Sequence, residues 1–319
     1  MIPSLGLVVA CILIFEPILH VSDSFQVDNG IYPIVGFGLL VLIPTVIIGY
    51  TLTALNTFIL KIFEGYILLS QLPLLKESHS RKAQKLIQEY ESIFNKIVLL
   101  DQKKRKSKAE KILLEELKED YYDKVSEYDQ IYPPPSAGIM PTKFGNILKA
   151  SEAYANTRYG IDSVELWPRL LHVIPSSYKQ HIDEARNELS FLVNMSALSL
   201  IFYILCIIAI LTSPPSIINP NWDMFFVNSL RYIIAGLFAL FLNWFFNKAA
   251  LFSVSGYGAM IRSAYDLFRL DLLEHLRLKT PKDSVEEYFI WKNLGEFTNL
   301  GKESLEFKTL SYKKKVVRN

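Results

Sequence analysis

The sequence predicts an all-α polytopic membrane protein with four transmembrane helices and a helical cytoplasmic domain. Half of the 319 residues are hydrophobic, and the mean hydropathy is +0.22. The apolar residues are concentrated in four runs, each long enough to be a membrane span. Lys and Arg are missing from two long stretches that contain these runs, and the remaining segments show the spacing of amphipathic helices.

The four apolar runs cover residues 2–21, 32–60, 191–211 and 225–246. A helix rises about 1.5 Å per residue, so about 20 residues cross a hydrocarbon core of about 30 Å. Backbone groups in lipid must satisfy their own hydrogen bonds, so we expect these runs to be helices. The first run has the alternative of a cleaved signal peptide, but no Lys or Arg precedes it and no small-x-small cleavage site follows it.

The distribution of positive charge predicts the orientation. Residues 1–60 and 187–230 contain no Lys or Arg, whereas residues 61–190 contain 20 and residues 231–319 contain 14. Cationic loops stay on the cytoplasmic side of a membrane. We therefore expect a multi-pass protein of the bacterial cytoplasmic (inner) membrane, with the N- and C-termini and residues 61–190 in the cytoplasm.

This pattern divides the chain into four segments. Residues 1–75 form a first transmembrane hairpin followed by a membrane-exit helix that stops at Pro73. This helix is either the second span continuing out of the bilayer or a helix lying in the membrane interface. Residues 76–190 form a cytoplasmic helical domain, with a helical pair at 81–130, a proline-rich break at 132–136 and a compact segment at 140–171. Residues 191–246 form a second transmembrane hairpin, which continues a helix that begins near Tyr178. Residues 247–319 form cytoplasmic C-terminal helices.

The predicted helical pair contains a basic run, Lys103-Lys104-Arg105-Lys106. The apolar residues on either side repeat at intervals of three and four, but the repeat changes frame across the run. This favours two helices packed as a hairpin over one long rod. The run itself is either a solvated turn or a contact with anionic lipid headgroups.

Sequence motifs of cofactor and metal chemistry are missing. The chain has no GxxxxGK[ST], no strand-GxGxxG-helix unit, no HExxH, no CxxC and no GxSxG. The five histidines show no ligand spacing, and Cys11 and Cys206 both fall inside apolar runs, which excludes a disulfide scaffold or a cysteine-based zinc module. With a net charge of +2 there is no basic field for nucleic acid. We expect no cofactor, no metal and no nucleic-acid partner.

Two charges lie inside predicted spans. Glu16 is at the outer end of the first span, with Pro17 and His20, and Arg231 is in the outer third of the fourth. Ionisable groups at membrane depth are costly and often functional, although Glu16 is close enough to the end to reach the headgroups. Arg231 either pairs with Glu16 or extends its guanidinium toward the outer surface.

The sequence Gly256-Tyr257-Gly258 is similar to a potassium filter, but it follows the last span, so close backbone packing is the better interpretation.

Three blocks of unusual residue density flank the spans. They read LNTFILKIFEGY after the second span, PTKFGNILKASEAY…RYGID…WPRL before the third, and GYGAMIRSAYDLFRLDLL after the fourth. On these blocks the chain resembles a group of uncharacterised bacterial four-span membrane proteins, and the resemblance covers most of the chain outside residues 81–130. The resemblance implies no biochemical role.

What the resemblance implies is that the three blocks are specified together, as a polar collar under the membrane. The candidate ligand or partner residues of the collar are Asn56, Glu64, Asn146, Glu152, Arg158, Asp162, Arg169, Arg262, Asp266 and Arg269. Aromatic residues accompany them, namely Tyr66, Tyr159, Trp167 and Tyr257. Either these residues lock helices together through ion pairs, or the same cluster binds a ligand, an ion or a partner.

Three functions remain open from the sequence. The first is a non-enzymatic membrane component, that is an oligomeric scaffold, a sensor or a pore-type effector, such as a membrane-disrupting effector of a bacterial defence system. Its partners would be the lipid bilayer, further copies of the chain and a cytoplasmic protein. The second is a membrane-embedded enzyme acting on lipid, with Glu152, Asp162 and Glu64 as acid–base groups and Arg158 or Arg169 on a phosphate.

The third function is a small channel or transporter. It ranks below the other two because few polar residues lie on the predicted spans. Those available are Asn194, Ser196, Ser199 and Asn243.

Overall fold

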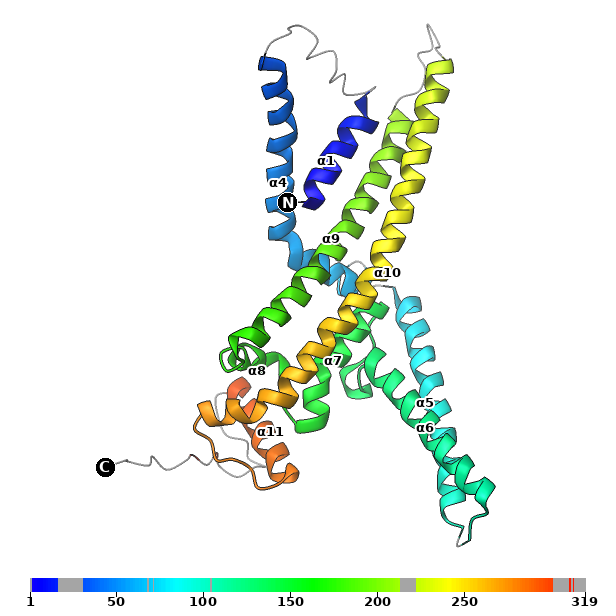
Figure 1. Cartoon of the computed structure of the whole chain (residues 1–319), viewed down its shortest axis with the longest axis vertical. Helices are drawn as coiled ribbons and strands as arrows, with labels where there is room; N and C mark the ends of the chain where they lie inside the picture. The colour runs from blue at the N-terminus through cyan, green and yellow to red at the C-terminus, as the bar shows by residue number, and fades with distance from the viewer. Residues whose placement is uncertain are drawn as a thin grey trace, which may run out of the picture. The chain divides into compact units, whose positions relative to one another are not determined.

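The computed structural model describes residues 2–16, 31–67, 69–70, 72–103, 105–212, 222–300, 310 and 312, and these residues are helical throughout apart from turns, short loops and one isolated β-bridge (Figure 1). The all-α prediction is confirmed for this part of the chain. The elements in chain order are α1 (Ile2–Ile14), α4 (Ile31–Glu64), α5 (Pro73–Asp101), α6 (Lys108–Ile131), the 3₁₀ turn η1 (Pro135–Ala137), α7 (Lys143–Tyr159), α8 (Ser163–Leu170), α9 (Ser176–Thr212), α10 (Trp222–His275) and α11 (Ser284–Leu300).

Three helices in the described part are long and apolar enough to cross a membrane, namely α4 over Gly36–Glu64, α9 and α10. They include the second, third and fourth predicted spans. The predicted first span is only partly described, because α1 has 13 residues and residues 17–21 lie outside the described part. At about 1.5 Å per residue, α1 measures about 20 Å, less than the hydrocarbon thickness.

The contacts divide the chain into two units, which we describe separately. Unit 1 comprises residues 1–61 and 187–252, and unit 2 comprises residues 62–186 and 253–319. Residues 62–75, grouped with the first hairpin from the sequence, belong to unit 2.

Unit 1 is held together by close contacts between α1, α9 and α10. Phe15 stacks on Tyr232 of α10 at 5.6 Å between ring centroids and meets Phe202 of α9 edge-on at 5.7 Å. Small residues let α9 and α10 approach: a Cβ on Gly236 would lie 3.5 Å from the Cβ of Cys206. Such small-residue seams are typical of helix packing in membranes, where apolar burial cannot drive association.

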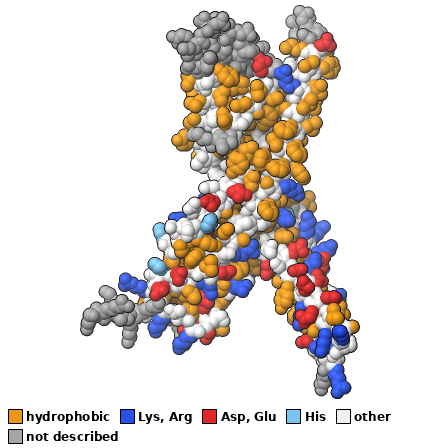
Figure 2. All heavy atoms as spheres, viewed as in Figure 1, with side chains coloured by type: hydrophobic (Ala, Val, Ile, Leu, Met, Phe, Trp, Pro, Cys, Tyr) orange, Lys and Arg blue, Asp and Glu red, His pale blue; other side chains and the backbone are white. Residues whose placement is uncertain are grey.

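A polar pair also joins α9 and α10. The Asn243 side-chain amide donates to the backbone oxygen of Ser196 over 2.8 Å and to its hydroxyl over 3.0 Å. The outer faces of these helices are apolar, as Figure 2 shows for the visible side of unit 1. Exposed side chains along α10 include Phe226, Ile234, Phe238, Phe241 and Trp244. An exposed apolar face of this extent needs a partner or a lipid environment.

In unit 2, α5 and α6 pack side by side as a hairpin (Figure 1). The helix α6 begins with a capping box, in which the Ser107 hydroxyl accepts from the Glu110 amide and the Glu110 carboxylate accepts from the Ser107 amide. A hydrogen bond from Lys103, followed by the one from Ser107, lowers the pKa of Glu110 to about 2. The connection between the helices contains the basic run, within which Lys106 pairs with Asp101 at 2.8 Å.

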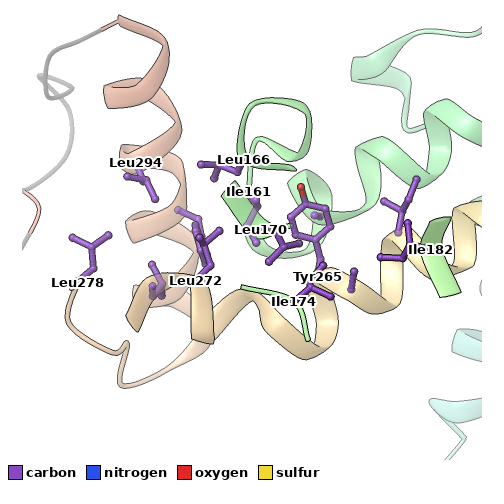
Figure 3. Close-up of a cluster of buried hydrophobic side chains, with 14 residues drawn as sticks. Ile161, Leu166, Leu170, Ile174, Ile182, Tyr265, Leu272, Leu278 and Leu294 are labelled. Atoms are coloured by element: carbon purple, nitrogen blue, oxygen red, sulfur yellow. The ribbon is translucent and has the colours of Figure 1, made fainter. Parts of the chain in front are cut away.

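The main hydrophobic core of unit 2 lies between α7, α8, the start of α9, the C-terminal part of α10 and α11 (Figure 3). Trp291, Ile161, Leu166 and Leu170 are fully buried in it. The Tyr265 hydroxyl donates to the backbone oxygen of Ser163 over 2.6 Å, so the one polar atom of this buried ring is satisfied. This core fixes the backbone of α7 and α10, on which most candidate site residues lie.

The end of α4 differs from the prediction. Both interpretations of this segment extend helix to Pro73, but α4 ends at Glu64, where Gly65 adopts φ +91°, a conformation that a glycine reaches without strain. Pro73 instead begins α5, at a first-turn position where its missing N–H has no intrahelical acceptor to lose. The proline was therefore the start of a helix and the glycine the stop.

Candidate functional site

The first two blocks meet where α4 ends and α7 begins. The Thr142 hydroxyl donates toward the backbone oxygens of Phe63 (2.7 Å) and Glu64 (3.0 Å) and accepts from the Gly145 amide (2.9 Å). One side chain thus serves the C-terminus of α4 and the N-cap of α7. A Cβ on Gly145 would lie 2.9 Å from the carbonyl carbon of Glu64 and closer still to its oxygen, so only glycine fits here.

Asn146, one of the predicted site residues, is fully buried and holds the loop before α7. Its amide group donates to the backbone oxygens of Met140 (2.9 Å) and Thr142 (2.8 Å), while its oxygen accepts from the Met140 amide (2.8 Å). These bonds use both donors and the acceptor of the side chain. Its role in the structure is therefore to fix this loop.

The second and third blocks meet where α7 crosses α10. A Cβ on Gly258 would lie 3.0 Å from the Cβ of Ser151, which is itself fully buried. Close backbone approach accounts for Gly258, whereas a Cβ on Gly256 would meet nothing within 4 Å, so the close-packing interpretation of the Gly-Tyr-Gly sequence applies to one of its two glycines.

A polar cluster in unit 2 joins α7, α10 and α11. Tyr159 donates to Asp266 over 2.6 Å, and Tyr154 lies 3.1 Å from each oxygen of the same carboxylate. The Arg269 guanidinium lies over the Tyr159 ring, 4.1 Å from its centroid, and its Nε donates to Glu287 over 2.8 Å. We call Tyr154, Tyr159, Asp266, Arg269 and Glu287 the α7–α10–α11 cluster.

The surroundings of this cluster favour the neutral form of its two tyrosines, Tyr154 and Tyr159. Burial, followed by the hydrogen bond to Asp266, raises the pKa of Tyr159 to about 12, although Arg269 opposes the shift. Glu287 is only 8% exposed and also accepts from the Trp291 indole over 3.4 Å. A buried ion pair of this kind holds its partners in place, because removing one of them leaves an uncompensated charge.

The other predicted charges of the second block are spread over unit 2. Asp162 caps α8 by accepting from the Glu165 amide and also accepts from Asn299 over 3.0 Å. Arg169 is exposed and donates to the Glu165 backbone oxygen. Arg158 is also exposed and lies over the Tyr154 ring, 5.7 Å from its centroid.

The predicted site residues Glu64 and Glu152 lie outside the α7–α10–α11 cluster. Burial, followed by Glu152 and then Glu64, raises the pKa of Tyr66, which places both carboxylates near one phenol. Burial also raises the pKa of Glu152 itself, against an opposing effect of Lys149.

Two more predicted residues lie apart from the cluster. Arg262 reaches the backbone oxygen of Asp129 at 3.5 Å. Asn56 lies in unit 1, where its amide donates to the Ser190 hydroxyl over 3.2 Å.

The two predicted intramembrane charges are also in unit 1. Glu16 is half-buried at the end of the described part of the N-terminal segment, and Arg231 is exposed on α10. Their mutual pairing stays a prediction. Pro17 and His20 lie outside the described residues.

A cavity of about 430 Å³ opens between the α5–α6 hairpin and α7. Its lining is rich in tyrosine and contains one carboxylate and one guanidinium. The lining residues are Tyr90, Tyr121, Val125, Tyr128, Asp129, Tyr132, Pro134, Pro135, Ala150, Tyr154, Thr157 and Arg158. The volume lies within the range of about 300–1,000 Å³ typical of small-molecule sites.

The sequence analysis missed several of these residues. Ser107 followed at the third position by Glu110 is the readable signal of a capping box, and Thr142 is a residue type preferred at helix N-caps. Glu287 carries no such signal, because its role depends on contacts between helices distant in the chain. The hairpin tyrosines Tyr90, Tyr121 and Tyr128 belong to the predicted repeat of three and four, which indicates a helix seam but not a cavity. In the part of the chain that the structure describes, no three His, Cys, Asp or Glu side chains are grouped as a metal site.

No protein-family model matches this chain, and neither a curated protein nor a solved structure matches it. The functional argument therefore depends on the geometry above.

Proposed function

We propose that this protein is a non-enzymatic membrane component, anchored by its apolar helices, whose unit 2 is a cytoplasmic sensor for a ligand or a protein partner. The observation that carries the proposal is the engagement of the polar residues of the three blocks with one another. Asp266, Arg269 and Glu287 are bound between helices, and Asn146 and Thr142 hold helix ends. This arrangement supports a unit whose helices respond together when one of them is displaced.

The proposed location is the inner membrane of a bacterium, with four spans and with both termini in the cytoplasm. The exposed apolar faces of α4, α9 and α10 support insertion into lipid. The first of the four spans would cover residues 2–21, in addition to the three spans in α4, α9 and α10. The absence of Lys and Arg from residues 1–60 and 187–230 supports the orientation.

Reporter fusions test this layout directly. A fluorescent protein that matures only in the cytoplasm should be bright when inserted at position 120, and alkaline phosphatase should be active when inserted within residues 22–30. Phosphatase activity at position 120 would overturn the orientation and the sensor role with it.

A homo-oligomer is part of the proposal, because a scaffold or pore of few spans needs more than one copy. Light scattering of the protein in a mild detergent, corrected for bound detergent, should give a defined multiple of 36.6 kDa. A monomer at all protein concentrations would contradict the oligomer but leave the orientation intact.

A lipid-acting enzyme is the second candidate, with Glu152 and Asp162 as acid–base groups. The raised pKa of Glu152 favours it, since general acids are often tuned in this way. Against it, Asp162 is engaged as the N-cap of α8. If Glu152→Gln and Asp162→Asn abolish the cellular activity while the purified variants keep the wild-type melting temperature, the enzyme would be favoured over the sensor.

A channel or transporter has less support. Of the polar residues on the predicted spans, Asn243 and Ser196 bind each other, and the Ser199 hydroxyl donates to the Met195 backbone oxygen over 2.8 Å. These groups are used within and between helices and leave few polar atoms to line a path.

A further inference from the structure

The tyrosine-lined cavity between the α5–α6 hairpin and α7 is the feature of unit 2 that the polar contacts described above do not explain. Five of its lining residues are tyrosines, from three different helices and the loop that follows α6. A hairpin needs apolar residues at its seam, but it does not need an open aromatic cavity. Aromatic side chains around a cavity provide large, rigid contact surfaces for a ligand.

The geometry of the rings restricts the shape of that ligand. Tyr90 makes an angle of 83° with Tyr121 and 73° with Tyr128, at centroid distances of 6.2 Å and 6.1 Å. Rings at nearly right angles cannot hold one planar base between parallel faces. They can surround a compact tetrahedral group on several sides.

The charges restrict the ligand further. Asp129 lines the cavity, and the pKa of Tyr90 is raised first by burial and then by Glu91 and Asp129. The α5–α6 side of the cavity therefore carries the carboxylate, whose charge the nearby Arg262 partly offsets. The negative faces of aromatic rings add to the potential of this carboxylate and attract organic cations.

Arg158 lies on the opposite side, over the Tyr154 ring. That ring face is already covered by a cation, so the open rings are those of α5 and α6. The exposed guanidinium is placed for an anionic group on the same ligand, such as a phosphate or a carboxylate.

We propose that this cavity binds a quaternary ammonium group, enclosed by Tyr90, Tyr121 and Tyr128 and neutralised by Asp129. The same chemistry occurs in free choline or betaine solutes and in the headgroup of a choline lipid. The proposal deepens the sensor function and rests on it for its purpose, but the binding itself is independent of orientation and of oligomeric state.

The test is calorimetric titration of the purified full chain in detergent. Choline should bind, and its uncharged isostere 3,3-dimethylbutan-1-ol should bind at least about tenfold more weakly, because cation–π attraction needs the charge. Phosphocholine and a short-chain phosphatidylcholine below its micelle concentration form the other arms. Tighter binding of the short-chain lipid than of choline assigns a lipid source, and equal or weaker binding assigns a free solute.

Two pairs of variants locate the site. Tyr121→Leu should weaken choline binding about tenfold, whereas Tyr288→Leu should leave it unchanged, since Tyr288 lies on α11, is 37% exposed and does not line the cavity. Asp129→Asn should weaken it similarly, with the exposed Asp123→Asn of the same helix as control. Melting temperatures confirm folding of each variant.

Four results would overturn the assignment, three of which concern choline itself. These three are equal affinity for choline and its isostere, wild-type binding by folded Asp129→Asn and Tyr121→Leu, and no heat up to millimolar choline. Tighter binding of adenosine monophosphate than of any choline compound would also overturn it, in favour of a planar ligand. Phosphatase activity at position 120 would contradict the cytoplasmic sensor function, but a positive choline titration would still establish the binding site.

Discussion

Gly145→Ala should be the most damaging single-methyl change in the junction between α4 and α7. The added Cβ would lie 2.9 Å from the Glu64 carbonyl carbon, whereas carbon atoms normally approach to about 3.5–4.0 Å. The obstacle is backbone, which cannot rotate away as a side chain does. One helix end must therefore move by more than half an ångström, which also strains the hydrogen bond from Thr142 to Phe63.

The free-energy change follows from three contributions. Overpacking of this kind costs about 1–3 kcal/mol, and a weakened hydrogen bond costs about 1 kcal/mol. Alanine in place of glycine within a helix returns about 0.5–1 kcal/mol. The net destabilisation is about 1–3 kcal/mol, which corresponds to a melting temperature lower by roughly 3–10 °C.

A series of matched substitutions tests the reasoning. Gly256→Ala in α10 is the control, because nothing lies within 4 Å of its Cβ, and it should raise the melting temperature by about 1–3 °C. Gly258→Ala should fall between the two, since its Cβ meets the side chain of Ser151, whose hydroxyl can rotate. The assay is tryptophan fluorescence on heating in detergent. Equal melting temperatures for the Gly145 and Gly256 variants would refute the argument.

Three further outcomes are expected. Burial raises the pKa of Glu152 above its ordinary 4.5, so the folded state binds this proton more tightly than the unfolded state does, and stability should fall as pH rises from 4.5 through the raised pKa. Glu152→Gln should remove that fall in melting curves recorded between pH 4.5 and 7.5. An unchanged pH dependence in the variant would contradict this prediction. Asp266→Asn removes the charge that two tyrosine hydroxyls bind, so it should lower the free energy of unfolding by about 1.5–3 kcal/mol. It should also lower the pKa of Tyr159 from about 12, which ultraviolet titration measures. An unshifted titration would show that the carboxylate does not cause the raised pKa. Asn243→Leu removes the hydrogen bond from the Asn243 amide to Ser196 and should destabilise unit 1 by about 0.5–2 kcal/mol. Unfolding curves in urea or in a denaturing detergent measure this change. Wild-type stability of the variant would show that unit 1 does not need this hydrogen bond.

The long apolar helices were predictable because length and composition decide them. Each exceeds the roughly 20 residues that a span needs, and no tertiary contact is required to identify it. The all-helical class followed from the same periodicity. The end of α4 was not predictable from proline alone, because Pro73 stops a preceding helix and starts a following one equally well, and only the positive φ of Gly65 decides between the two.

The site was predictable in its residues but not in its pairing. Asp266 and Arg269 were identified from the third block, yet their partners Tyr154 and Glu287 come from helices 112 and 18 residues away along the chain. The cavity was not predictable at all, since its lining depends on how the α5–α6 hairpin packs against α7. Local sequence encodes caps and helix faces, while such contacts depend on the three-dimensional register of helices.

The doubly bound hydroxyl of Thr142 makes two helix ends into one cooperative element. Fraying of the last turn of α4 removes its acceptors there, and fraying of the first turn of α7 removes its donor, so each event loosens the other. Serine would retain this linkage and valine of equal shape would not. Loss of a hydrogen bond in the last turn of α4 therefore weakens a helix that begins almost eighty positions further along the chain.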